Sequence, residues 1–281
     1  MIPDKDTNLV YFSKFLKTKP EFVSTCNQIT DILDKYQVSY YFLEGTKDIW
    51  ARDYMPIQVS EKKFIEYRYD PDYLQGTEKG ARDSKTYPDI VCDSLNLKTI
   101  KTDILLDGGN IVKSSDCVIL TDKIVEENRL LCNKTELIGR LKELFEVDKV
   151  VLIPWDREIE YGHSDGMLRF IDNETVLIYE FYAADKILLK QLDKNGINWK
   201  VLKFNVKKAD KRNWAYINFL QTKDLILIPK FENDEDDQAL LQIKECFPEY
   251  DKRDRIHRVD MSKVIMFGGA LNCISWTIKK S

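Results

Sequence analysis

The sequence predicts an α/β fold in which a strand-strand-helix-strand unit repeats as a closed radial array. Three observations support this fold class: the hydrophobic pattern recurs in the same order, reactive residues recur at a constant spacing, and the composition is globular. The chain has 281 residues, of which 43% are hydrophobic and 11% aromatic, enough to bury a core. We expect one domain covering residues 1–281, because no Pro-, Gly- or Ser-rich linker divides the chain.

The hydrophobic period defines three successive units. The first has strands at 110–113 and Cys117–Thr121, a helix from about Thr135 to Phe145 and a strand at Lys149–Ile153. The second has strands at Met167–Ile171 and Thr175–Tyr179, a helix from about Asp185 to Lys194 and a strand at Trp199–Lys203. The third has strands at Tyr216–Leu220 and Leu225–Ile228, a helix from about Glu235 to Cys246 and a strand at Arg255–Val259. Such small sheets bury their faces only against neighbours, which favours radial packing.

One chemically reactive residue lies near the start of each unit. These residues are Asp53, Asp107, His163, Asn218 and Cys273, and they are 54, 56, 55 and 55 positions apart. One fifth of the 281 residues is about 56, so the length fits five units. Strands that start around a common axis would bring the five side chains together at one end.

Charge and composition argue against several classes of partner. The 43 basic and 47 acidic residues give a net charge of −4, and the scattered basic residues form no nucleic-acid footprint or membrane-binding helix. The first residues are polar and no apolar stretch follows them, so we expect no signal peptide and a cytoplasmic location. The six cysteines lack close pairs, which indicates neither a disulfide scaffold nor a zinc ribbon.

Glycines are concentrated at three of the spaced positions. Six of the 11 glycines fall in Asp107-Gly108-Gly109-Asn110, Gly162-His163-Ser164-Asp165-Gly166 and the segment from Gly268 to Cys273. Glycines allow close backbone approach, as a pocket walled by main chain requires. Each motif alone would fit a tight turn without a ligand, but three motifs beside ionisable side chains favour a site.

The candidate general acid or base is one of two histidines. His257 has cationic neighbours in a strand-like stretch and is expected at the surface, whereas His163 is two residues from Asp165. In a strand this spacing would place both side chains on one face. A metal site with Cys273 would lack a third nitrogen or sulfur ligand at zinc spacing, so no metal is expected.

The segment from Asp48 to Pro56 contains Trp50 and Asp53 ahead of an apolar strand. An aromatic wall beside a carboxylate suits a planar cation. A buried Trp with an Arg–Asp pair at a strand end explains the same residues structurally.

Together these motifs resemble the agmatine deiminase and bacterial peptidylarginine deiminase family of the guanidino-group-modifying pentein superfamily. The matching segments are Trp50-Ala51-Arg52-Asp53, Asp107-Gly108-Gly109-Asn110, Gly162-His163-Ser164-Asp165, Tyr216-Ile217-Asn218-Phe219 and Gly268-Gly269 through Ser275. The resemblance implies a five-fold pseudosymmetric β/α propeller, the pentein fold, in agreement with the repeat.

The resemblance also implies roles for individual residues. Cys273 would be the nucleophile and His163 the general acid and base, while Asp53 and Asp165 would hold a guanidinium group. Trp50 would line the pocket, Asp107 would replace a family Glu, and Asn218 would lie near the substrate. Three carboxylates should raise the pKa of Cys273, leaving a neutral thiol until a cationic substrate arrives.

The expected reaction is cysteine-dependent hydrolysis of a small cationic guanidino compound through a covalent thiouronium intermediate, without a cofactor. Agmatine, giving N-carbamoylputrescine and ammonia, is the leading substrate. Free or peptidyl arginine stays open, because Asn272 replaces a family His and Glu158-Ile159-Glu160-Tyr161 departs from the family sequence. Amidino transfer, a thiol peptidase and a non-catalytic guanidinium-binding module are the alternatives. The sequence leaves homo-oligomerisation open.

Overall fold

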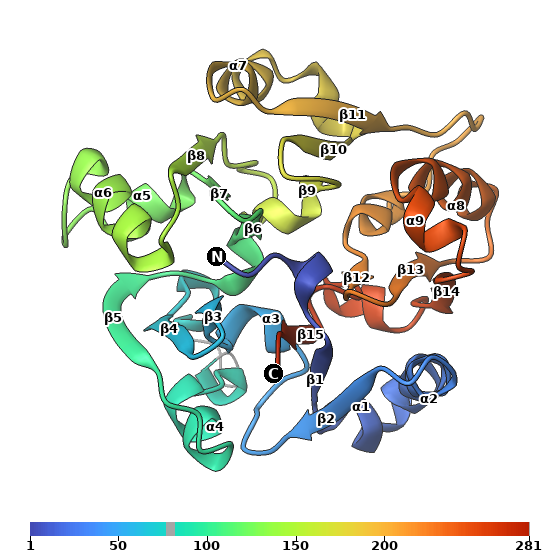
Figure 1. The fold of residues 1–281 in the computed structure, drawn as a ribbon, viewed down its shortest axis with the longest axis horizontal. Coiled ribbons are helices and arrows are strands. Elements are labelled where there is room, and N and C mark those ends of the chain that lie inside the picture. Colours follow the sequence, from blue (N-terminus) through green and yellow to red (C-terminus); the bar gives the residue numbers. More distant parts are fainter. Residues whose placement is uncertain (77–81, 281) are drawn as a thin grey trace.

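The computed structural model describes residues 1–76 and 82–280. Within these residues, fifteen strands form five three-stranded sheets. Figure 1 shows the five sheets arranged around a common centre, with the longer helices on the outside. The predicted α/β fold of repeated units is therefore confirmed.

All five sheets share one topology. From the centre outward they are β15 (Ser275–Ile278), β1 (Leu9–Ser13) and β2 (Ser39–Leu43); β3 (Ile57–Ser60), β4 (Lys63–Arg68) and β5 (Ile100–Leu105); β6 (Val112–Lys113), β7 (Cys117–Thr121) and β8 (Lys149–Ile153); β9 (Leu168–Phe170), β10 (Thr175–Tyr179) and β11 (Asn198–Leu202); β12 (Leu220–Gln221), β13 (Ile226–Lys230) and β14 (Ile256–Asp260). In every sheet the middle strand is antiparallel to the inner strand and parallel to the outer one. The parallel pair requires a crossover, which a helix supplies.

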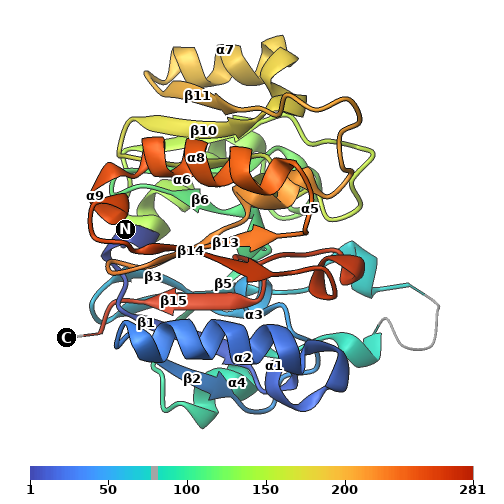
Figure 2. The same ribbon diagram turned by 90° about the vertical axis from the view of Figure 1, so that its right-hand side faces the viewer.

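The crossover helices cover the outer strands, as Figures 1 and 2 show. They are α2 (Pro20–Lys35), α4 (Pro88–Ser94), α5 (Lys123–Glu127) with α6 (Lys134–Phe145), α7 (Lys186–Lys194), and α8 (Glu235–Cys246) with α9 (Pro248–Asp251). In α2 the buried residues Phe22, Cys26, Ile29 and Leu33 recur every three or four positions, so one stripe of the helix faces the core.

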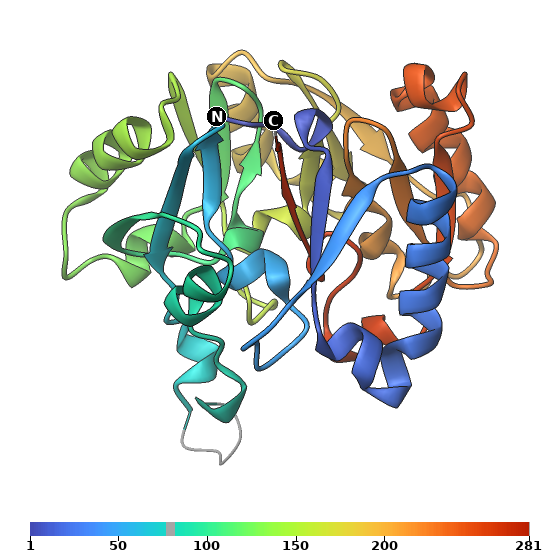
Figure 3. The same cartoon turned by 60° about the horizontal axis from the view of Figure 1, so that its bottom comes forward.

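The two ends of the chain share one sheet. β15 pairs with β1 from Leu9 opposite Ile278 to Phe12 opposite Ser275. Because β15 begins two residues after Cys273, the pairing fixes the nucleophile candidate against the start of the chain. Figure 3 shows β15 running away from this point toward the end of the molecule where both termini lie.

The predicted strand bounds hold for most strands but are wrong where the chain approaches the axis. The predicted strand Tyr216–Leu220 is a 3-10 helix over Asn213–Ile217 followed by the short β12. The predicted strand 110–113 begins only at Val112, because Gly108–Asn110 form another 3-10 helix. Met167 likewise lies outside β9. Ala215, Tyr216 and Ile217 are all buried, and an apolar run of this length does not distinguish a buried turn from a strand.

These short helices and turns place all five spaced residues at one end of the sheets. Each of the five lies a few residues before the inner strand of a different sheet: Asp53 before β3, Asp107 before β6, His163 before β9, Asn218 before β12 and Cys273 before β15. In the described part of the chain, no helix is both long enough and apolar enough to span a membrane.

Candidate active site

Cys273 lies between two side chains from neighbouring repeats. Its Sγ is 3.2 Å from Asn218 Oδ1 and 3.8 Å from Asp165 Oδ2. Cys273 is 7% exposed and lines both cavities described below. A thiol in this position donates to the Asn218 amide oxygen and faces the Asp165 carboxylate.

The Asn218 side chain also binds the backbone at Cys273. Its Oδ1 also accepts hydrogen bonds from the backbone N–H groups of Asn272, at 3.0 Å, and Cys273, at 3.2 Å. Asn218 is completely buried and does not line either cavity at Cys273. Its predicted substrate-binding role stays a prediction; in this structure its side chain contacts Cys273, Asn272 and the Asp165 carbonyl.

His163 contacts two of the predicted carboxylates. Its Nε2 is 3.0 Å from Asp107 Oδ2, and its Nδ1 is 3.7 Å from Asp53 Oδ1. The expectation that His163 and Asp165 share the face of a strand is wrong, because Ser164–Gly166 form a 3-10 helix. This turn sends Asp165 toward Cys273 and leaves His163 between Asp53 and Asp107.

The glycine motifs allow close approach, as expected from the sequence. The Gly109 N–H donates to Asp53 Oδ1 at 3.1 Å, and a Cβ atom on Gly109 would lie 2.4 Å from His163 Nδ1. A Cβ atom on Gly269 would lie 2.2 Å from the Trp50 ring. Any larger residue at these two positions would displace the histidine or the tryptophan.

Two cavities meet at Cys273 and share Tyr161, His163 and Gly268. The acidic cavity, of about 300 Å³, is lined by Asp48, Trp50, Asp53, Tyr69, Tyr73, Leu74, Ser84, Glu160 and Phe267 besides the shared residues. None of its described lining residues is Lys or Arg. The aromatic cavity, of about 400 Å³, includes Asp165, Tyr179, Phe181, Tyr182, Trp214 and Lys211.

The site carries an excess of carboxylates that shifts the pKa of its members. Burial disfavours the His163 cation, but Asp53, Asp107 and Asp165 outweigh it and raise the pKa of His163 to about 9. Burial, with Asp107 and Asp165, raises the pKa of Asp53 despite the nearby His163. For Cys273, burial is the largest cause and Asp165 and Asp53 add to it, so its pKa lies well above the ordinary value. The direction is the one expected from the sequence.

All seven predicted site residues lie in one region. Five of them line the two cavities: Cys273, His163, Asp165, Asp53 and Trp50. The other two line neither cavity; Asp107 contacts His163 and Asn218 contacts Cys273. His257 lies elsewhere, stacked on Tyr36 with the ring centroids 4.8 Å apart.

Three further residues shape the site and were not predicted. Tyr73 donates from its hydroxyl to Asp107 Oδ2 at 3.0 Å, and its ring packs edge-on against Tyr161. The buried Lys123 donates to the Tyr161 carbonyl at 3.1 Å and to Asp72 at 2.9 Å. Because Asp72 directly precedes Tyr73, Lys123 links the segment that carries Tyr73 to the segment that carries Tyr161. Tyr161 directly precedes the Gly162-His163 motif; Tyr73 and Lys123 carry no comparable signal in the sequence.

Asn272, at the position where the family usually has His, binds a site carboxylate. Its Nδ2 donates to Asp165 Oδ2 at 2.6 Å. The same oxygen faces Cys273, so Asn272 fixes the carboxylate beside the thiol.

Comparison with known proteins places this site in a family. The family model described as Porphyromonas-type peptidyl-arginine deiminase matches residues 17–278. The chain belongs to this family. A relative from Mycoplasma capricolum, named "Putative agmatine deiminase", is 26% identical over 223 residues, which are 66% of this chain and 60% of the relative. The match thus spans less than two thirds of that relative's length.

Solved structures share the fold of this deiminase-family chain. The C. jejuni agmatine deiminase has a TM-score of 0.76 at 16% identity, covering 100% of this chain and 96% of that one. A dimethylarginine dimethylaminohydrolase adduct has a TM-score of 0.63 at 12% identity, covering 96% and 99%. The fold is therefore that of the penteins, as the sequence resemblance implied.

Proposed function

We propose that this protein hydrolyses the guanidino group of a small cationic compound, with Cys273 as the nucleophile and His163 as the general acid and base. The observation that carries the proposal is the convergence of Cys273, His163, Asp165 and Asp53 on two adjoining cavities. Membership of a deiminase family supports the same reaction class.

The charge of the site fits a guanidinium group. Asp53, Asp107 and Asp165 face one imidazole and one thiol, so the carboxylates outnumber the cation even when His163 is protonated. A guanidinium is a planar cation whose N–H groups pair with carboxylates. Asp53 and Asp165 would hold it from opposite sides of Cys273, and Trp50 would cover it.

The reaction would proceed in two steps. The bound guanidinium favours the Cys273 thiolate, whose proton leaves to solvent, and the thiolate attacks the guanidinium carbon; the carbon–nitrogen bond breaks as protonated His163 gives its proton to the departing ammonia. The product of this step is a thiouronium, in which Sγ is bonded to the former guanidinium carbon. His163, now neutral, then takes a proton from water, and the hydroxide attacks the same carbon. The carbon–sulfur bond breaks, the hydroxyl proton passes to the leaving sulfur of Cys273, and the ureido product forms.

Agmatine is the substrate that the acidic cavity favours. Asp48 and Glu160 line this cavity together with Asp53, and none of its described lining residues is Lys or Arg. A terminal ammonium would be attracted there, whereas the α-carboxylate of arginine would be repelled. The products would be N-carbamoylputrescine and ammonia.

A substrate panel tests the proposal. Agmatine, arginine, blocked arginine peptides and methylated arginines are incubated with the protein, and ammonia and ureido product are measured, with Cys273→Ala as control. Release of ureido product without an added amine indicates hydrolysis rather than amidino transfer. Cleavage of a fluorogenic peptide panel would instead indicate a thiol peptidase, and no turnover at all would indicate a binding module.

We propose that the enzyme acts in the cytoplasm as a single catalytic domain and needs no nucleic acid, membrane or cofactor for this reaction. Each chain carries a full set of the proposed catalytic residues. Sedimentation of the purified protein measures its oligomeric state.

A further inference from the structure

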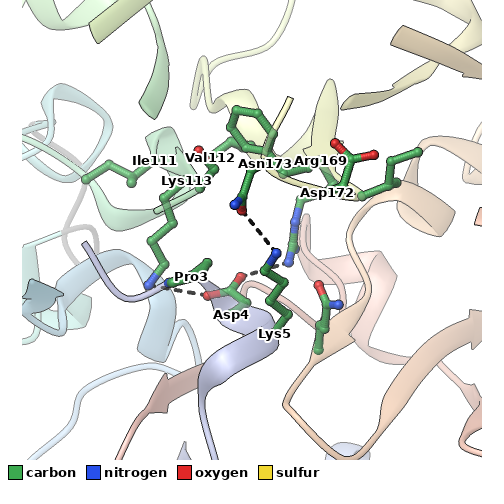
Figure 4. A pocket seen from close by; sticks show the side chains of 13 residues that line it. Pro3, Asp4, Lys5, Ile111, Val112, Lys113, Arg169, Asp172 and Asn173 are labelled. Atoms are coloured by element: carbon green, nitrogen blue, oxygen red, sulfur yellow. Dashed lines mark hydrogen bonds and ion pairs between the residues drawn. The ribbon is translucent and has the colours of Figure 1, made fainter. Parts of the chain in front are cut away.

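A buried charge cluster lies on the axis of the molecule, next to the active site but outside both cavities. Its centre is the Asp4 carboxylate, and three cations from different repeats point to it: Arg169 at 2.8 Å, Lys113 at 3.3 Å and Arg52 at 3.7 Å. Figure 4 shows Asp4 between Lys113 and Arg169. The three cationic side chains are 4 to 5% exposed and Asp4 is 13% exposed.

Asp4 is the only anion of this cluster in the described part of the chain. Among the described residues, no other carboxylate lies within ion-pair distance of Arg52, Lys113 or Arg169. Buried like charges repel strongly unless an opposite charge separates them. The carboxylate therefore determines where the three cations sit.

Two of these cations bind the backbone beside the nucleophile. Arg52 Nε donates to the Asn272 carbonyl at 3.4 Å, and Arg169 Nη1 donates to the Phe219 carbonyl at 3.1 Å. Asn272 directly precedes Cys273, and Phe219 directly follows Asn218. The Arg52 backbone N–H also donates to the Cys273 carbonyl at 3.0 Å. Among the described residues, Lys113 pairs with no charged group except Asp4 and donates no hydrogen bond to this backbone.

The N-terminal segment is anchored so that Asp4 stays on the axis. Met1 donates from its amino group to the Ser115 carbonyl at 3.0 Å, and Lys5 donates to Asn173 Oδ1 at 3.0 Å. Thr7 Oγ1 closes the turn by donating to the Asp4 carbonyl at 2.7 Å. Both termini lie at the end toward which β15 runs (Figures 2 and 3), so Asp4 reaches the cluster from the side away from Cys273.

We propose that Asp4 is a positioning residue for the proposed reaction: it holds Arg52 and Arg169 where they fix the backbone on which Cys273 and Asn218 stand. This inference rests on the proposed function for its activity measurements. It also has a readout that needs no substrate, the rate at which Cys273 is alkylated as a function of pH.

The first test is Asp4→Ala in the full-length protein. We expect kcat to fall by about 10- to 100-fold with KM changed less than about twofold, because a nucleophile displaced by about 1 Å reacts far more slowly. Removing the carboxylate also leaves Arg52 and Arg169 without a counter-charge near a thiol whose pKa is raised by burial and by Asp165 and Asp53. The alkylation profile of Cys273 should therefore shift to lower pH, since positive charge favours the thiolate.

Adding formate to Asp4→Ala tests whether a carboxylate at the position of Asp4 is what the variant lacks. The substitution removes a carboxylate beside a small surface cavity lined by Asp4, Lys5, Lys113, Arg169 and Gln221, through which a small anion can enter. Added formate should restore kcat and return the alkylation profile toward that of the unaltered protein. Restoration of thermal stability by formate without restoration of either property would overturn the proposal.

Two variants serve as matched controls. Asp6→Asn alters the exposed carboxylate of the same 3-10 helix, and Lys113→Met removes a partner of Asp4 that binds no backbone beside Cys273. Both should keep kcat; Asp6→Asn should also keep the alkylation profile, and Lys113→Met, which removes a positive charge, should not shift it to lower pH. If Asp4→Ala does not fold, the double variant Asp4→Asn with Lys113→Met replaces it. This variant removes one negative and one positive charge and still tests whether the Asp4 carboxylate positions Arg52 and Arg169.

The outcomes separate this inference from the proposed function. If the unaltered protein turns over no guanidino compound, the proposed function fails and the alkylation profile still reports on Asp4. If a folded Asp4 variant shows the kcat and alkylation profile of the unaltered protein, Asp4 has a purely structural role and the inference fails.

Discussion

The amide oxygen of Asn218 lies 3.2 Å from the Cys273 sulfur and also accepts the Cys273 backbone N–H at 3.2 Å. One side chain thus fixes both the backbone and the thiol of the proposed nucleophile. Because Asn218 belongs to a different repeat from Cys273, the contact depends on the packing of neighbouring sheets.

Replacing Asn218 with Ala should lower kcat by about 10²-fold, because the thiol loses the acceptor that orients it. Steady-state kinetics on the substrate found in the panel measures this effect. Asn213→Ala is the matched control: Asn213 is also buried in the same turn, but its Oδ1 faces Tyr179 rather than Cys273. An unchanged kcat in Asn218→Ala would show that the thiol needs no such support.

Asp53→Asn and Asp165→Asn should each cost about 3–5 kcal/mol of transition-state stabilisation, because the cationic substrate loses a buried ionic partner. The expected fall in kcat/KM is about 10²- to 10⁴-fold. Asp185→Asn keeps a competent cap at the start of α7 at a residue that lines neither cavity, and should leave kcat/KM unchanged. Near-normal kcat/KM in both site variants would argue against carboxylate recognition of the guanidinium.

A small guanidinium ion that leaves Cys273 accessible should accelerate its alkylation by iodoacetamide at pH 7. The empty site raises the pKa of the thiol through burial and the charges of Asp165 and Asp53, and a bound cation opposes the effect of these charges. Labelling is followed by mass spectrometry with and without the ion, using tetramethylammonium as a cation without N–H donors. Equal labelling rates in all three samples would contradict ionisation assisted by the substrate.

The substrate-free protein should lose stability as the pH rises from about 6.5 to 9. The pKa of His163 is about 9 in the folded protein, against 6.5 for the unperturbed group, so its ion pairs stabilise the fold fully below pH 6.5. This contribution, up to about 3 kcal/mol, disappears as the pH passes 9. The raised pKa of Asp53 acts in the same direction, because its ionisation in the folded state is unfavourable. Urea unfolding at several pH values should show a shallower decline in His163→Gln over this interval.

Lys123→Met should raise KM and lower the free energy of unfolding by about 1–3 kcal/mol, because buried acceptors lose their donor. Lys123 joins Asp72 to the carbonyls of Glu160 and Tyr161. Without it, Tyr73 and Tyr161, which line the acidic cavity, should be held less firmly in place. Lys134→Met, at the exposed start of α6, is the matched control. A variant with normal KM but reduced stability would limit Lys123 to a structural role.

The repeat and the chemistry were readable in the sequence because both depend on local patterns. Alternating strands and amphipathic helices predicted the units from residue 110 onward, and glycines next to Asp107, His163 and Cys273 marked the turns around the site. No such pattern assigned the first units, in which β1 shares a sheet with β15 from the other end of the chain. The turn at Asn213–Ile217 was mistaken for a strand because burial produces the same apolar run in both.

The sequence by itself determined the fold class, the family and the identity of the residues that meet at the site. Only the tertiary structure decided their partners: His163 lies between Asp107 and Asp53, Asn272 binds Asp165, and Asp4 lies among three cations on the axis. These pairs are between 48 and 165 positions apart. Local hydrophobic periodicity carries no information about such separations, and the partners are fixed only when five sheets pack around one axis.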